Sequence, residues 1–197
     1  MQKLYSAVAL ALGILILIAG TARAFDGNRS GFLLGFGLGS GYTHVTQTVT
    51  SSYVGDTSAS EDKFGVASEF KIGAGIGEQF QLYYVNRLNW FSADSAGGST
   101  TFTAGVGLVG VSYYLEKEAP SIYLMGLIGV STWDTPFEDN GSSSVGFGIG
   151  AGAGWEFARH FSFEGTVNWG NPSDDSSGFH VDTRFTTVLL TVNAIAY

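Results

Sequence analysis

The stretch GFGIGAGAGWEF, residues Gly146–Phe157, restricts the possible folds of this chain more than any other segment. Glycine occupies every second position from Gly146 to Gly154, and the residues between the glycines are apolar. Side chains two residues apart share a face in a β-strand, so the pattern predicts a strand with one bare face and one apolar face. A dinucleotide-binding loop would need a glycine turn followed by a helix. No helix-forming segment follows here, so we reject that interpretation.

The first 24 residues are typical of a secretory signal peptide. Lys3 is followed by an apolar run from Tyr5 to Ala19 and by the small-residue triad Ala22-Arg23-Ala24. The run is short for a membrane-spanning helix, and a cleavage triad follows it directly. We therefore expect residues 1–24 to be a signal peptide and residues 25–197 to form one domain.

Composition narrows the class of protein further. The chain has no cysteine and a formal charge of −8, which excludes a disulfide scaffold and argues against nucleic-acid binding. Only 13% of the residues are charged, against about a quarter in an ordinary soluble domain. No segment after residue 24 is apolar enough for a transmembrane helix. An exported chain of this kind is expected to consist of alternating strands.

The alternation recurs along the chain in segments of suitable length. The predicted strands are Gly31–Gly41, Phe64–Ile76, Phe80–Phe91, Thr101–Tyr114, Ser121–Trp133, Val145–Phe157, Phe161–Trp169 and Thr183–Tyr197. Each could cross a bilayer as a tilted strand of roughly 9–11 residues. Short connections, at 77–79, 116–120 and 158–160, alternate with long polar ones, and all three prolines are expected in connections.

The apolar face of each strand is predicted to point outward. In Thr101–Tyr114 this face carries Phe102, Ala104, Val106 and Leu108, opposite Thr103, Gly105 and Gly107. An apolar exterior suits lipid, and a closed barrel would satisfy every backbone hydrogen bond there. Ser121–Trp133 is apolar on both faces, so its register stays open.

Aromatic residues mark both ends of the predicted strands. Trp90, Trp133 and Trp169 lie where strands enter long connections, and a second set lies near the short connections: Phe80, Trp155, Phe157, Phe161 and Tyr197. Two aromatic bands around an apolar belt are typical of membrane barrels.

With these features, residues 25–197 resemble the small eight-stranded outer-membrane barrels of the OmpA/OmpX type. The resemblance implies an all-β fold, an eight-stranded antiparallel up-and-down transmembrane β-barrel in the bacterial outer membrane, with both ends in the periplasm. It implies contact with outer-membrane lipid and lipopolysaccharide, and insertion by the barrel-assembly machinery through the C-terminal strand. Ile195 and Tyr197 fit the outward apolar positions of that strand, but Thr191 and Asn193 share their face, so its register stays open. We expect a monomer.

Several charged side chains fall on the face predicted to line the lumen. They are Glu69, Lys71, Arg87, Glu156 and Glu164, with Tyr113 expected beside them. An eight-stranded barrel has an interior just wide enough for side chains, and buried charges there must pair. A structural ion network that fills the core is therefore preferred over a gated conduction path.

Enzymatic and metal sites have weaker support. His160-Phe161-Ser162 matches the His-x-Ser motif of lipid A deacylases, with Glu164 nearby. The alternation places these residues in the lumen at the short-connection end, away from the outer leaflet, so we expect no catalytic site and no cofactor. His44, His160 and His180 lack metal-ligand spacing, and no metal site is expected. The long connections hold ten acidic residues against Lys63 alone, which we interpret as a solvated surface in preference to a divalent-cation site.

The function expected from the sequence is that of a non-enzymatic outer-membrane protein with a structural or surface-interaction role. It would present four acidic, Ser/Gly-rich extracellular loops. The alternative is a narrow porin-like channel for ions or small polar solutes. A secreted ligand-binding barrel of the lipocalin type is less consistent, because it would place the apolar faces inside.

Overall fold

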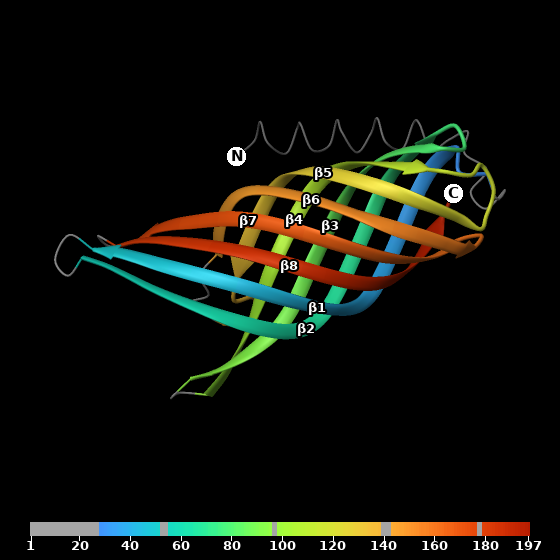
Figure 1. The fold of residues 1–197 in the computed structure, drawn as a ribbon. Helices are drawn as coiled ribbons and strands as arrows, with labels where there is room; N and C mark the ends of the chain where they lie inside the picture. The colour runs from blue at the N-terminus through green and yellow to red at the C-terminus, as the bar shows by residue number, and fades with distance from the viewer. Residues whose placement is uncertain (1–27, 52–54, 96–97, 139–142, 177–178) are drawn as a thin grey trace.

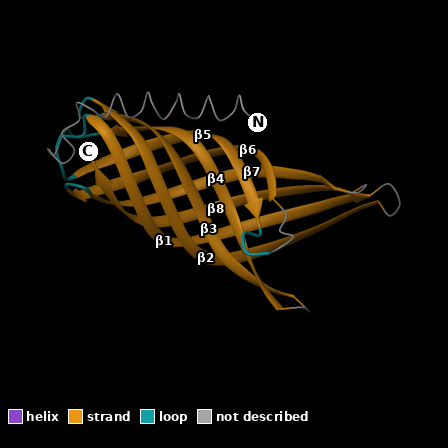
Figure 2. Cartoon of the chain, turned by 180° about the vertical axis from the view of Figure 1, so that it is seen from behind, coloured by secondary structure: helices purple, strands orange, loops and turns teal. Residues whose placement is uncertain are grey.

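The computed structural model describes residues 28–51, 55–95, 98–138, 143–176 and 179–197, and these form a single closed barrel (Figures 1 and 2). Its strands are β1 (Gly31–Ser51), β2 (Gly55–Ile76), β3 (Phe80–Ser95), β4 (Gly98–Tyr114), β5 (Ser121–Asp134), β6 (Ser143–Ala158), β7 (Phe161–Ser176) and β8 (Phe179–Ala196). Each pairs antiparallel with the next, and β1 closes the ring on β8. The predicted fold class is confirmed. The predicted signal peptide lies outside the described residues, among which no helix is long and apolar enough to cross a membrane.

The strands extend well beyond the predicted segments. Three of the four connections that we expected to be long loops are mostly β-hairpin, and β1–β2 pairing continues from Gly41↔Gly65 to Ser51↔Gly55. β8 follows β1 over the same distance, as far as Ser51↔Phe179. As a result β7, β8, β1 and β2 project together from one end of the barrel, while the β3–β4 hairpin leaves in a different direction (Figure 1).

One proline contradicts the expectation that prolines avoid strands. Pro172 lies within β7, opposite Gly146 of β6. On the other side, the β7–β8 pairing passes from Gly170↔Phe185 to Ser173↔Asp182 and omits the positions between. Proline has no backbone N–H to donate, so it is tolerated where the ladder is interrupted.

The outward apolar faces form a broad belt, as predicted for most strands. Phe64 is 80% exposed, Leu38 68% and Leu190 63%, and β6 exposes Val145, Phe147, Ile149 and Trp155. The register of β5, which the sequence left open, places Ile122, Leu124, Ile128 and Val130 outward. Such extensive apolar exposure is expected only where the surrounding medium is apolar too.

The glycine face of β6 points inward and makes room for side chains from other strands. A Cβ atom on Gly154 would lie 2.2 Å from the ring of Tyr123, and one on Gly150 would lie 2.5 Å from the side-chain oxygen of Asn168. The glycines of GFGIGAGAGWEF therefore allow close packing inside the barrel.

The prediction for β4 is wrong. Ala104, Val106 and Leu108 are buried in the lumen, whereas Val109, Val111 and Tyr113 are exposed on the outside. The outward glycines of β4 are covered by side chains of β3: Leu88 lies against Gly105, and the Tyr84 hydroxyl lies against Gly107. Tyr113 therefore belongs to the belt, where its ring packs against Phe80.

The register of β8, which the sequence left open, is also settled by the structure. Ile195 and Tyr197 are each 3% exposed and face the lumen together with Thr191 and Asn193, while Val188, Leu190 and Val192 face outward. Trp133, expected in the aromatic band, is buried as well. Of the other predicted band residues, Trp90, Phe157 and Trp169 are half-buried, and Phe80, Trp155 and Phe161 are exposed.

Candidate functional site

Four charged side chains from three strands meet inside the lumen. Glu69 and Lys71 lie two residues apart on β2, and Arg87 is the register partner of Glu69 on β3. Glu164 reaches them from β7. Lys71 Nζ lies 2.6 Å from Glu164 Oε1 and 3.1 Å from Glu69 Oε1, and Arg87 contacts both carboxylates at 2.5 Å (Glu69) and 3.1 Å (Glu164). We call these residues the charge quartet.

The quartet is neutral in formal charge and almost completely enclosed. All four side chains are at most 3% exposed. The Tyr123 hydroxyl donates to Glu164 Oε1 at 2.6 Å, and Arg87 Nη2 points at the Met125 sulfur at 3.3 Å. Arg87 Nη1 has no hydrogen-bond partner among the described residues. Each carboxylate contacts both cations, so the quartet links β2 and β3 to β7 directly across the lumen.

Glu156, which the sequence placed in the same network, lies apart from the quartet and pairs with a residue that the sequence did not single out. Arg29, just before β1, donates from Nε to Glu156 Oε2 at 2.8 Å and also pairs through Nη2. The Tyr197 hydroxyl donates to the other carboxylate oxygen at 3.0 Å. Glu156 is therefore the centre of a second cluster. This cluster lies at the end of the barrel that carries the short turns, which we call the inner mouth.

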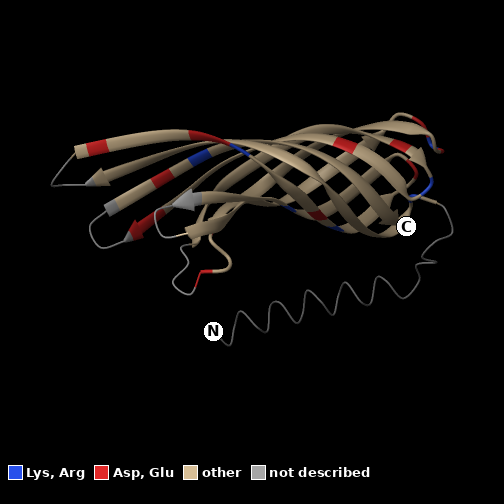
Figure 3. Cartoon of the chain, turned by 90° about the horizontal axis from the view of Figure 1, so that it is seen from below, with Lys and Arg blue, Asp and Glu red and all other residues tan. Residues whose placement is uncertain are grey.

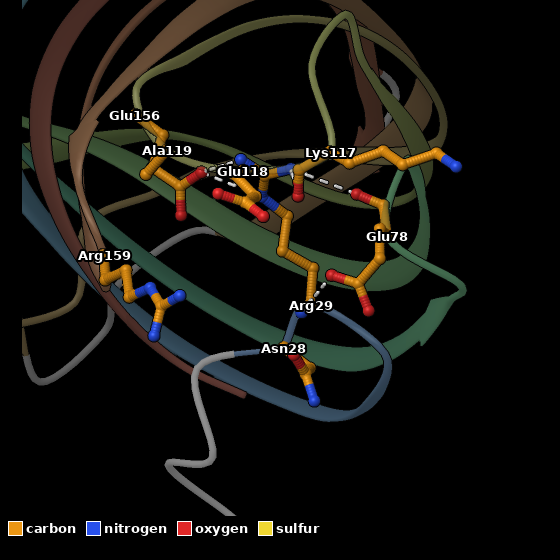
Figure 4. Close-up of a pocket in the computed structure, with 8 residues that line it drawn as sticks. All are labelled: Asn28, Arg29, Glu78, Lys117, Glu118, Ala119, Glu156 and Arg159. Carbon is orange, nitrogen blue, oxygen red and sulfur yellow. Dashed lines mark hydrogen bonds and ion pairs between the residues drawn. The ribbon is translucent and has the colours of Figure 1, made fainter.

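Arg29 closes this inner mouth. Its Nη1 donates to the backbone carbonyls of Glu78, Glu116 and Lys117 at 2.7–3.1 Å, which ties the β2–β3 and β4–β5 turns together. The guanidinium lies 4.1 Å from the ring centroid of Tyr114. Beyond it, a pocket of about 240 Å³ opens between the turns, with Glu118 and Arg159 at its rim (Figure 4).

The backbone of Arg29 lies directly against β2. A Cβ atom on Gly75 would be 1.6 Å from the Arg29 carbonyl oxygen, so only glycine permits this approach. No alternating pattern precedes Gly31, which is why strand periodicity did not reveal Arg29. The available signal was its charge in a chain with only nine Lys and Arg residues.

The opposite end of the lumen is filled by uncharged side chains. An aromatic cluster lies there: Phe91, Phe102 and Trp133 are in mutual ring contact and Phe185 packs against Trp133, with centroids 5.6–6.3 Å apart. Between this aromatic cluster and the quartet, Asn89 donates to Thr43 at 2.8 Å, and Leu108 is fully buried. A cavity of about 190 Å³ borders the aromatic cluster, between β1–β2 and β3–β4. Packed side chains therefore occupy the lumen from the aromatic cluster to the quartet, and Arg29 with Glu156 closes the end beyond the quartet.

The residues of the His-x-Ser motif are engaged in structural contacts. His160, in the β6–β7 turn, lies with Nδ1 2.8 Å from the Ile195 carbonyl oxygen, and its ring packs against Tyr197. Ser162 Oγ lies 3.0 Å from the Tyr123 hydroxyl oxygen, and Glu164 belongs to the quartet.

Acidic residues lie along the projecting strands (Figure 3), and two of them contact a histidine. His180 Nδ1 lies 2.6 Å from Asp175, and its Nε2 lies 3.4 Å from Asp182. The hydrogen bond to Asp175, and then the charge of Asp182, raise the pKa of His180 above its usual range. Within the described residues, no group of three or more His, Asp or Glu side chains could hold a metal ion.

Comparison with solved structures concerns the fold. OprG, an outer-membrane protein from Pseudomonas aeruginosa, superposes with a TM-score of 0.54 at 8% identity, over 86% of this chain and 98% of OprG. Neisserial surface protein A gives 0.47 at 13% identity (88% and 99% covered), and Ail of Yersinia pestis gives 0.39 at 9% identity (79% and 97% covered). No protein-family model and no curated protein sequence matches the chain.

Three observations agree on the class of fold. The eight strands form a closed ring, and an apolar belt surrounds this ring. The superposition on OprG covers 86% of this chain and 98% of OprG. The chain therefore has the fold of the small eight-stranded outer-membrane β-barrels, the class that its sequence resembles.

Proposed function

We propose that this chain is a non-conducting surface protein of the bacterial outer membrane that binds a partner along an unpaired strand edge. The observation that supports the proposal is the outer half of β2. Residues 55–65 pair with β1 on one side, but pairing with β3 begins only at Val66↔Trp90. Over these residues β3 pairs with β4 instead and leaves in another direction (Figure 1).

A free strand edge offers backbone N–H and C=O groups to any extended segment that lies beside it. The outer part of β2 is exposed over nearly its whole length, from Gly55 to Asp62. Three further strands support it from the other side, because β1, β8 and β7 continue the same sheet. The edge is therefore held in an extended conformation before any partner arrives, which lowers the entropic cost of binding.

Charge indicates what kind of segment would bind there. Asp56, Glu61 and Asp62 lie along this edge, against the single cation Lys63. An extended segment that carries Lys or Arg would find complementary charge, while a second copy of the same acidic edge would be repelled. The proposed partner is thus a basic segment in β conformation.

The lumen supports the non-conducting half of the proposal and disfavours the porin-like alternative. A solute would have to pass Arg29, the charge quartet and the aromatic cluster in turn. Each is buried and held by several contacts. Eight strands leave little interior beyond packed side chains.

The proposed orientation places the projecting sheet outside the cell, because the short turns of such barrels face the periplasm. An epitope inserted after Gly55 should be detected on intact cells. The same epitope inserted after Glu118, in the β4–β5 turn, should be detected only after the outer membrane is opened. The reverse pattern would contradict this orientation.

Peptide selection tests the binding edge. Peptides selected from a random library on the protein in lipid nanodiscs should be basic and rich in β-branched residues. Methylating alternate backbone nitrogens of such a peptide should abolish binding, because the edge pairs through backbone hydrogen bonds. The double variant Glu61→Lys/Asp62→Lys should weaken binding at least tenfold, whereas Glu116→Lys/Glu118→Lys, at the opposite end, should not. Binding that withstands both methylation and charge reversal would contradict the proposal.

A further inference from the structure

The cavity of about 190 Å³ beside the aromatic cluster lies where the barrel wall divides. β2 and β3 pair as far as Val66↔Trp90, and beyond this point the β1–β2 and β3–β4 hairpins separate (Figure 1). β2 lines the cavity with Ala59, Glu61 and Lys63, and β3 lines it with Phe91 and Ala93. The cavity is therefore enclosed by the two strands whose mutual pairing ends there.

The three lining residues of β2 lie on its unpaired edge, residues 55–65, which among the described residues pair only with β1. They alternate along the strand, and the register partners of Ala59 and Glu61 on β1, Gln47 and Val45, line the cavity as well. A strand added beside this edge would have the same two faces, because side chains opposite each other in paired strands share a face. Every second side chain of the added strand would therefore point toward the cavity.

The aromatic cluster forms the floor of the cavity. Phe91 and Trp133 are 5% and 7% exposed, and Phe102 packs against both, with ring centroids 6.2 Å and 5.8 Å away. Ala59 and Ala93 contribute only a methyl group each to the walls, which leaves room above the rings. An apolar side chain that entered the cavity would leave water and contact these rings.

The polar groups around the cavity already have partners. Lys63 Nζ lies 2.8 Å from Glu61 Oε2, and Gln47 Nε2 donates to Thr183 Oγ1 at 3.3 Å. A charged side chain that entered the cavity would lose contact with water above an aromatic floor, a cost that an apolar side chain avoids. The lining therefore favours an apolar occupant.

The acidic groups that would attract a basic segment lie mainly on the other face of β2. Asp56 and Asp62 are exposed, and they occupy positions that alternate with the cavity-lining residues. Opposite charges on neighbouring strands attract most strongly when both side chains are on the same face. The basic residues of a bound segment are therefore expected on its outward face, and its inward face is left for apolar residues.

We propose that the cavity receives one large aromatic side chain from the basic β-segment that pairs with the edge of β2. This side chain lies beside Glu61, the middle one of the three lining residues, while Lys or Arg residues of the segment lie outward, on the side of Asp56 and Asp62. Backbone hydrogen bonds hold a strand added to a sheet edge, and pockets for alternate side chains select its sequence. The inference rests on the proposed function and adds the feature by which the edge distinguishes one basic segment from another.

Synthetic peptides test this inference on the protein in phosphatidylcholine nanodiscs, with empty nanodiscs as background. The parent peptide alternates Lys and Thr over the length of residues 55–65, and a second peptide carries Trp in place of the central Thr. Fluorescence anisotropy of labelled peptides should show that the Trp peptide binds at least about tenfold more tightly, because the cavity buries the indole. A third peptide, with Trp in place of the neighbouring Lys, should show no such gain, because its Trp points outward.

A matched pair of variants tests whether the gain arises in the cavity. Ala93→Leu fills the cavity from β3 and leaves the backbone edge of β2 intact, so it should abolish the gain without weakening the parent peptide. Ser92→Leu changes the next residue, which is exposed and does not line the cavity, and should keep the gain. If Ala93→Leu does not fold, Ala59→Leu with Ser60→Leu as control fills the same cavity from β2.

The outcomes separate this inference from the proposed function. If neither peptide binds, the edge of β2 is not a binding site, and both proposals are wrong. If the parent and Trp peptides bind equally, or if the gain persists in Ala93→Leu, the edge proposal stands and the aromatic anchor is overturned. If free N-acetyltryptophanamide binds as tightly as the Trp peptide and Ala93→Leu abolishes this binding, the occupant is a small molecule and not a β-segment.

Discussion

At the scale of single residues, Arg87 is the side chain in the lumen whose environment is most restricted. It is 1% exposed and pairs with carboxylates from β2 and β7, on different sides of the barrel. Such a group cannot shed its charge, and its partners cannot reach water. Removing it would leave Glu69 and Glu164 with Lys71 as their only paired cation among the described residues.

Arg87→Ala is therefore expected to destabilise the folded barrel by about 3–5 kcal/mol, the cost of leaving a buried charge uncompensated. Urea unfolding in detergent micelles measures this change. Arg184→Ala, which removes an exposed arginine on β8, should change the stability by about 0.5 kcal/mol or less. Equal effects of the two substitutions would mean that the quartet contributes nothing to stability.

A second prediction at this scale concerns Gly75. Gly75→Ala should displace the Arg29 backbone and destabilise the barrel by about 1–3 kcal/mol, because the added methyl would overlap the Arg29 carbonyl. Gly126→Ala adds the same methyl to open space and should be nearly neutral. The same unfolding measurement compares them, and an unaffected Gly75→Ala variant would show that Arg29 does not hold the inner mouth.

The sequence was informative about single residues where strand alternation reached them. It placed Glu69, Lys71, Arg87 and Glu164 on inward faces, and the structure brings these four together. It could not separate Glu156 from them, because inward direction says nothing about depth along the barrel. Arg29 was missed because it precedes the first alternating segment.

At the scale of elements, strand existence could be predicted and strand extent could not. Inside the belt, one face of each strand meets lipid and the other meets the packed lumen, so the residue types alternate along the strand. Beyond the belt both faces of a strand meet water, so residues such as those of 55–63 show no alternation although they are paired. Alternation alone therefore predicts loops where the structure has hairpin extensions.

The error in β4 has a related cause. Alternation identifies the two faces of a strand. It shows which face points outward and which lines the lumen only when one face is clearly more apolar. In β4 the lumen takes Val106 and Leu108, and the outward glycines rely on cover from Tyr84 and Leu88 of β3. Cover from a neighbouring strand depends on register, which the sequence of one strand does not contain.

The β7–β8 hairpin should respond to pH through His180. Because Asp175 and Asp182 raise the pKa of His180 in the folded hairpin, protonation stabilises the hairpin. This contribution is complete below the ordinary histidine pKa of about 6.5 and is lost as the pH rises through the folded value. An NMR titration should show a raised pKa for His180, and Asp175→Asn should lower it. An unchanged pKa in that variant would contradict the assigned cause.

At the scale of the whole molecule, three levels of packing close one barrel. The inner mouth is closed by Arg29 with Glu156, the middle by the charge quartet, and the outer end by the aromatic cluster. The exterior is apolar around the barrel and acidic on the projecting sheet (Figure 3). Interaction with other molecules is therefore expected at the surface, not through the lumen.

Single-channel recording in planar bilayers tests this closure most directly. Purified wild-type protein should give no steady conductance steps at any applied voltage that the bilayer tolerates, because side chains fill the lumen at all three levels. A wider, known outer-membrane pore inserted by the same procedure shows that steps would be detected. Reproducible steps from the folded wild type would contradict the closed lumen, and the porin-like alternative would then replace the surface-protein proposal.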